Sequence, residues 1–128
     1  MIFLATSVAL AHLLSEKRRP KSEFWDQPII ASRLLEYELW ARLNKLELQR
    51  VQDAEARSLI GRIALIEMIP EIVARARDRF PSDVRSLEAL HLASASFLIR
   101  QGVELQLASY DRRMREGARR LDITLYQL

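Results

Sequence analysis

The sequence predicts an α/β fold, a single domain over residues 1–128 in which helices cover both faces of a central, mainly parallel sheet. Two observations indicate this three-layer α/β/α sandwich. Short apolar segments of strand length alternate along the chain with longer segments that have helical periodicity and helix-capping residues. Most of the short segments are apolar throughout, which is typical of parallel strands that are buried on both faces. Strand order does not follow from this pattern.

Each element can be bounded from its flanking residues. Strands are expected at residues 2–5, 28–31, 103–109 and 123–126. Helices, counted from their capping residues, are expected at about 6–14, 32–48, 53–61, 70–79, 86–100 and 111–121. The predicted caps have side chains that accept hydrogen bonds from a helix N-terminus: Thr6, Ser7, Ser32, Asp53, Ser86 and Asp111. Pro70 suits a first helical turn and Gly102 a helix end, whereas residues 63–69 are ambiguous.

The composition excludes several kinds of chemistry. The chain has no cysteine, so disulfides, thiolate metal sites and cysteine nucleophiles are ruled out, and the composition suits a reducing cytoplasm. The apolar opening, residues 1–14, has no preceding basic residue and is too short to span a bilayer, so we expect a buried strand and helix there. The 20 Lys and Arg residues exceed the 17 Asp and Glu residues, and the net charge of +3 suits an anionic partner such as nucleic acid.

Three carboxylates are expected near the points where strands give way to helices. Ligands of open parallel sheets bind beyond the carboxyl ends of the strands, and Asp111, Glu88 and Glu38 lie close to the helix starts at that edge. At about 100° per residue, Glu38 projects at the edge of the apolar helix face, whereas Glu36 points to the polar side. A carboxylate at a core edge is costly unless it is paired or bound to a cation, so Glu38 is the better candidate.

Each of these acids also has an ordinary structural interpretation. Asp111 can be a helix cap, Glu88 an acid favoured by the helix dipole, and Glu38 the partner of a nearby arginine. However, three carboxylates at one sheet edge repel one another unless a cation lies between them. Oxygen ligands without cysteine favour Mg²⁺ or Mn²⁺, and such ions activate water for phosphodiester hydrolysis. The residues therefore predict metal-assisted hydrolysis.

Four short motifs at these positions resemble the PIN-domain family, and in particular the VapC-type toxin ribonucleases of bacterial toxin–antitoxin pairs. They occur in family order over nearly the whole chain: MIFLATS at the start, SRLLEYEL from Ser32, VRSLEALHLA from Val84 and SYDRR from Ser109. The family usually has Asp-Thr-Ser in the first motif and Leu-Asp-Ala-Leu-His-Leu-Ala in the third. By this resemblance, Ala5 stands where the family has its first acid, and Glu88 stands where it has an aspartate.

The resemblance implies an activity, a cofactor and partners. It implies an endoribonuclease that cuts RNA with Mg²⁺ or Mn²⁺, and metal-binding acids at Glu38, Glu88 and Asp111. Thr6 and Ser109, which sit beside the acid positions, are supporting candidates. The resemblance also implies a VapB-like antitoxin that binds the first helices and plugs the acidic site, as well as a toxin homodimer.

The departure at Ala5 leaves two interpretations open. An alanine side chain cannot bind a metal, so the chain is expected to be inactive or weakened, whether the alanine was introduced or arose naturally. The alternative is a catalytically silent PIN-like module that acts by binding antitoxin or RNA. Arg112 and Arg113, which directly follow Asp111, are expected to guide RNA phosphates toward the sheet edge. His91 is expected to be a structural histidine within the third motif.

Overall fold

The computed structural model describes residues 1–128 and contains a four-stranded sheet in which every pair of strands is parallel. The strands are β1 (Ile2–Leu4), β2 (Ile29–Ser32), β3 (Ala64–Ile66) and β4 (Gln106–Ala108), in the order β3-β2-β1-β4. β1 is therefore a central strand, and its carboxyl end points to the same edge as those of β2 and β4. The predicted parallel α/β architecture is confirmed.

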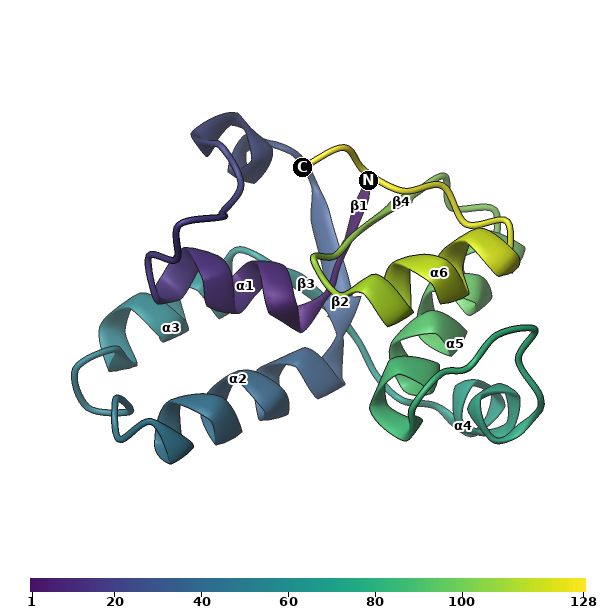
Figure 1. Ribbon diagram of the computed structural model, residues 1–128, viewed down its shortest axis with the longest axis horizontal. Coiled ribbons are helices and arrows are strands. Elements are labelled where there is room, and N and C mark those ends of the chain that lie inside the picture. Colours follow the sequence, from purple (N-terminus) through teal and green to yellow (C-terminus); the bar gives the residue numbers. More distant parts are fainter.

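Helices cover both faces of this sheet (Figure 1). On one side lie α1 (Thr6–Leu13), α2 (Arg33–Lys45) and α3 (Asp53–Gly61), and on the other lie α4 (Pro70–Arg77), α5 (Ser86–Arg100) and α6 (Arg112–Arg120). A short 3₁₀ helix, Ser22–Asp26, precedes β2 and was not predicted. No helix has the length and apolar character needed to cross a membrane.

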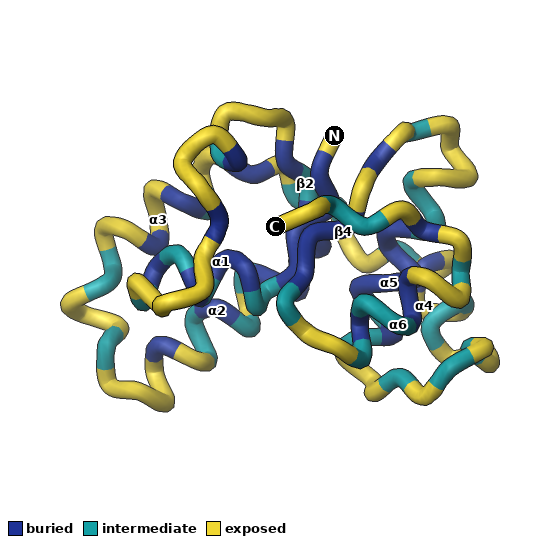
Figure 2. The backbone as a smooth tube through the Cα atoms, turned by 45° about the horizontal axis from the view of Figure 1, so that its top comes forward, coloured by how far each residue is buried: buried dark blue, intermediate teal, exposed yellow.

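The central strand separates two hydrophobic cores. Ile2 and Leu4 pack into the core beneath α1, α2 and α3, whereas Phe3 and Ala5 pack into the core beneath α5 and α6. Successive side chains of a strand point to opposite faces, so an uninterrupted apolar run is what a strand covered on both sides requires. Figure 2 shows the buried backbone gathered at the strands and at the inner turns of the helices.

Two of the predicted helix caps are confirmed. Ser32 Oγ accepts a hydrogen bond of 3.1 Å from Leu34 N, and Asp111 Oδ1 accepts one of 2.8 Å from Met114 N. The other predicted caps are wrong, since these residues lie in the first turn of their helices and make no capping bond: Thr6, Ser7, Asp53 and Ser86. In each of these helices the cap position is the residue before the predicted cap, and that residue makes no side-chain capping bond. The cap positions are Ala5 for α1, Gln52 for α3 and Arg85 for α5.

Several boundaries also differ from the predictions. The last predicted strand, residues 123–126, is wrong: it is reduced to one parallel bridge between Leu107 and Leu125, because its backbone bonds to β4 are only those from Leu107 N to Thr124 O and from Tyr126 N to Leu107 O. The ambiguous residues 63–69 contain the edge strand β3. The long second helix ends at Lys45, before Glu47 takes a left-handed conformation with φ of 58°. Gly102 follows α5 with φ of 93°, as its predicted role as a helix stop requires.

Candidate functional site

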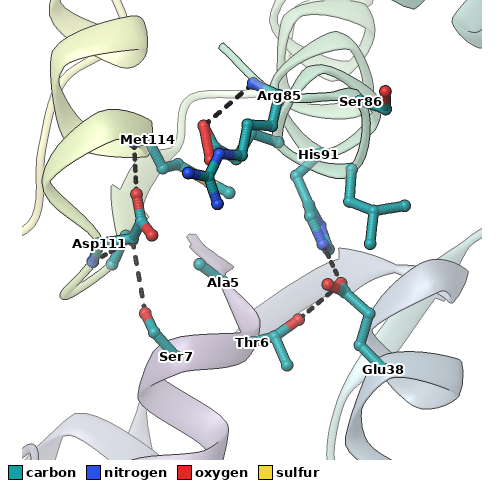
Figure 3. A pocket seen from close by; sticks show the side chains of 12 residues that line it. Ala5, Thr6, Ser7, Glu38, Arg85, Ser86, His91, Asp111 and Met114 are labelled. Atoms are coloured by element: carbon teal, nitrogen blue, oxygen red, sulfur yellow. Dashed lines mark hydrogen bonds and ion pairs between the residues drawn. The ribbon is translucent and has the colours of Figure 1, made fainter. Parts of the chain in front are cut away.

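A pocket of about 420 Å³ lies at the edge of the sheet where β1 ends and α1 begins (Figure 3). The pocket is lined from both layers of helices, by Glu38 of α2 on one side and by Glu88 and His91 of α5 on the other. The candidate acids, their supporting residues and the family's first acid position all line this pocket: Ala5, Thr6, Glu38, Glu88, Ser109 and Asp111. The topology thus brings together side chains that span more than a hundred positions of the sequence.

Glu38 is held by side chains from two other helices. Thr6 Oγ1 donates a hydrogen bond of 2.9 Å to Glu38 Oε1, and His91 Nε2 on α5 hydrogen-bonds the same oxygen (Figure 3). The Glu38 side chain is 21% exposed, whereas Glu36 is 36% exposed and forms a surface ion pair with Arg33. The helical periodicity therefore selected the glutamate that faces the pocket.

His91 lies almost fully buried in the wall of this pocket. Its Nε2 contacts Glu38, but its Nδ1 has no hydrogen-bond partner in the structure. Its contact with Glu38 joins α5 to α2 across the pocket. The sequence indicated a structural histidine, and this contact adds that the histidine holds one of the candidate acids.

Glu88 and Asp111 each bond the N-terminus of their own helix. Glu88 Oε2 accepts a hydrogen bond of 3.3 Å from Arg85 N at the start of α5, and Asp111 Oδ1 caps α6. These are the ordinary structural contacts expected of acids at helix starts. In each carboxylate the second oxygen has no hydrogen bond to the protein, so both retain capacity to bind a ligand.

Two serines fasten the loop that carries Asp111 to the start of α1. Tyr110 N donates a hydrogen bond of 3.0 Å to Ser7 Oγ, and Asp111 N donates one of 3.0 Å to Ser109 Oγ. The two hydroxyl oxygens are 3.5 Å apart. Ser109 therefore supports the site by positioning the loop before α6.

Ala5 lies where the central strand ends, between the opposing walls of the pocket (Figure 3). It is 1% exposed, and its backbone N donates a hydrogen bond of 3.0 Å to Ala108 O on the neighbouring strand. Its methyl group packs with the core beneath α5 and α6. A carboxylate at this position would therefore be buried and would start from the face of the sheet that α5 covers.

Comparison with known proteins identifies the family. The sequence profile of the PIN domain matches residues 2–120, nearly the whole chain. The chain belongs to the PIN-domain family. The resemblance inferred from the four motifs is thus confirmed. A search of curated protein sequences gave no match.

Solved structures with the same fold support this PIN assignment. A toxin–antitoxin complex from Klebsiella pneumoniae superimposes with a TM-score of 0.70 at 18% sequence identity, covering 100% of both chains. A sarcin–ricin-loop-cleaving VapC toxin from Mycobacterium tuberculosis superimposes with a TM-score of 0.68 at 16% identity, covering 91% of this chain and 95% of that one. At these identities the likeness establishes the fold.

The PIN pocket of this chain does not present a metal site. No group of three His, Cys, Asp or Glu side chains is arranged closely enough to hold a metal ion. The donor chemistry suits Mg²⁺ or Mn²⁺, but the three carboxylates are spread over the pocket walls. A methyl group stands between them at Ala5, and one acid is already bonded to Thr6 and His91. The residues present therefore do not fit a bound divalent ion.

The positive charge in the PIN pocket does not come from the predicted arginines. Arg112 and Arg113 belong to the first turn of α6 and are absent from the pocket wall. The arginine that lines the pocket is Arg85, at the start of α5. One feature of the sequence could have drawn attention to Arg85, because it lies three residues before Glu88 in the third motif. Helical periodicity, however, does not show where the side chain of a residue at the cap position points.

A second groove continues from this pocket between α1 and α2. It shares Thr6, Ser7, Glu38, Leu87 and Asp111 with the pocket and has a volume of about 720 Å³. Its lining combines apolar and aromatic side chains with charged ones, which besides the shared residues are these: Leu10, Leu14, Ala41, Tyr37, Tyr110, Glu16, Arg18, Arg42 and Lys45. The PIN pocket and this groove are therefore adjoining depressions that share part of their walls.

Proposed function

We propose that this PIN domain is the toxin component of a VapBC-type toxin–antitoxin pair. Its parent activity is metal-dependent cleavage of RNA, and the cleavage site of the present sequence is incomplete at position 5. The observation that carries the proposal is the place of Ala5. It ends the central strand between carboxylates that reach the pocket from both layers of helices.

The proposed roles follow from the pocket walls. In a form with an acid at position 5, that acid would join Glu38, Glu88 and Asp111 as ligands of Mg²⁺ or Mn²⁺. Such an ion lowers the pKa of a bound water and stabilises the charge that develops on a phosphodiester. Thr6 orients Glu38 through its hydroxyl, and Ser109 holds the loop that carries Asp111.

The proposed partners are an antitoxin, RNA and a second copy of the toxin. A structural neighbour from Klebsiella pneumoniae is part of a toxin–antitoxin complex, and the groove between α1 and α2 offers apolar side chains, such as Leu10 and Leu14, against which an antitoxin segment could bind. The absence of cysteine suits the cytoplasm, where such a pair would act.

The test is RNA cleavage by the chain as given and by its Ala5→Asp variant, each with Mg²⁺ or Mn²⁺. We expect the Ala5→Asp variant to cut faster by about two orders of magnitude or more, since metal activation contributes several kcal/mol of transition-state stabilisation. A chelator should abolish this cleavage. Ala5→Asn is the matched control, because the amide has nearly the same size without the negative charge, and it should remain inactive.

A second substitution separates the acid from the cap at Asp111. Asparagine caps helices about as well as aspartate, so Asp111→Asn placed in the Ala5→Asp variant should leave the melting temperature nearly unchanged and abolish cleavage. If Ala5→Asp is folded and cuts no RNA with either metal, the nuclease proposal fails. The chain would then be better described as a silent PIN-like module that acts by binding antitoxin or RNA.

A further inference from the structure

Arg85 is the only Arg or Lys side chain in the wall of the pocket. It occupies the position before the first residue of α5, and its residue is exposed to solvent. Figure 3 shows its side chain reaching over the pocket, between the side that carries Asp111 and the side that carries His91 and Glu38. A positive charge therefore faces the same space as the carboxylates.

The guanidinium of Arg85 has no partner in the protein. The ion pairs of the structure involve other arginines on the surface, such as Arg33 with Glu67 and Arg57 with Asp53. The nearby carboxylate of Glu88 instead accepts a hydrogen bond from the backbone N of Arg85. All five N–H groups of this guanidinium therefore remain free to bind a ligand.

A free guanidinium at this place is suited to a phosphate. The planar fork of arginine donates two parallel hydrogen bonds to a phosphate, with a geometry that a lysine ammonium cannot reproduce. An RNA strand that enters the pocket approaches three carboxylates, which repel its phosphates. A cation in the pocket wall offsets part of this repulsion.

We propose that Arg85 binds an RNA phosphate in the pocket, next to the position of cleavage. The inference rests on the proposed function for the identity of the substrate, but it concerns binding and needs no metal. The sequence suggested that Arg112 and Arg113 guide RNA phosphates toward the sheet edge, and Arg85 differs from them in lining the pocket itself. Arg85 is thus a substrate-binding residue.

The test measures the affinity of the chain as given for a short, mixed-sequence single-stranded RNA by fluorescence anisotropy. Arg85→Gln should weaken binding about tenfold or more, the range for a lost hydrogen bond to a charged group. The slope of log K against log salt should fall by about 0.7, the value for one phosphate contact on a single strand. Arg85→Lys should recover part of the affinity, because it keeps the charge and loses the fork.

The matched control is Arg100→Gln, which removes an equal charge from the other end of α5. That end lies about 20 Å away at 1.5 Å per residue, well beyond the Debye length of about 8 Å in physiological salt, so its effect on binding should be small. Equal losses in Arg85→Gln and Arg100→Gln would mean that only net charge matters, and this would overturn the proposal. Circular dichroism melting confirms that the compared variants are folded.

The outcomes distinguish this inference from the proposed function. If Ala5→Asp cuts RNA and Arg85→Gln binds RNA like the unchanged chain, the nuclease stands and the phosphate site does not. If Ala5→Asp cuts nothing and Arg85→Gln still loses affinity with the lower salt slope, the phosphate site stands in a binding module. If no variant binds RNA at all, the role of Arg85 is wrong.

Discussion

Thr6 Oγ1 donates a hydrogen bond of 2.9 Å to Glu38 Oε1 and so ties the start of α1 to the second turn of α2. His91 reaches the same carboxylate oxygen from α5, on the other side of the sheet. One carboxylate thus joins three helices at the edge where the sheet opens. A half-buried acid is tolerated here because these donors replace water.

The first prediction concerns this hydrogen bond. Thr6→Val keeps the shape of the side chain but removes the donor, so we expect the free energy of unfolding to fall by about 1.5–3 kcal/mol, the range for hydrogen bonds to charged groups. Urea denaturation measures this loss. Thr6→Ser retains the hydroxyl and should lose clearly less. Equal losses in the two variants would show that the methyl group, and not the hydrogen bond, stabilises the protein.

The second prediction separates a true helix cap from a false one. Ser32 Oγ accepts the hydrogen bond of Leu34 N, so Ser32→Ala should destabilise the protein by about 1 kcal/mol. Ser86 is the first residue of α5 and makes no capping bond, so Ser86→Ala should change stability by less than about 0.5 kcal/mol. Thermal melting of both variants provides the comparison, and a larger loss at Ser86 would contradict the assigned start of α5.

The third prediction concerns stability after an acid is restored at position 5. Ala5 is 1% exposed, so an aspartate there buries a charge near Glu38, Glu88 and Asp111 and should lower the melting temperature of the metal-free protein. Mn²⁺ should raise the melting temperature of Ala5→Asp, because a ligand that binds the native state stabilises it. The same Mn²⁺ should leave the chain as given and Ala5→Asn unchanged. A shift of equal size in all three would point to unspecific binding.

The fourth prediction is a pH dependence of stability that arises at His12. Burial lowers the pKa of His12 below its ordinary value of 6.5, with a further contribution from Arg62 that outweighs the opposing effect of Glu55. The ring packs against Trp25 with centroids 4.6 Å apart. Because the unfolded chain then binds a proton more readily than the native one, stability should fall as the pH drops below 6.5.

The readout for His12 is the free energy of unfolding measured over a pH series. His12→Gln removes the titrating group and should flatten the dependence between neutral pH and the range in which carboxylates begin to titrate. An unchanged slope in His12→Gln would assign the dependence to other groups.

Much of the fold could be predicted from sequence because the strands are buried on both faces. The segments around Ile2 and Ile29 are apolar at every position, as strands covered on both faces of a parallel sheet are expected to be. The caps were predicted less well. Thr6 and Ser86 have capping side chains, but the preceding residues already take the extended backbone that begins each helix, and sequence propensity does not reveal this.

Sequence reasoning brought the three carboxylates to one edge of the sheet, but it did not point to Arg85 in the wall of the pocket. Helical periodicity placed Glu38 on the pocket side, and the sheet edge brought it together with Asp111. The contact between His91 and Glu38 joins residues 53 positions apart, which no local pattern can indicate. Arg85 was missed for a related reason: the direction of its side chain depends on how α5 packs against the sheet.

The position of β1 at the centre of the sheet has a consequence for synthesis of the protein. Its neighbour β4 and the loop that binds Ser7 come from the far end of the chain, and Tyr110 lies 103 positions after Ser7. On the ribosome, translation runs from the N-terminus, so the nascent polypeptide cannot close this pocket until nearly all of its message has been read.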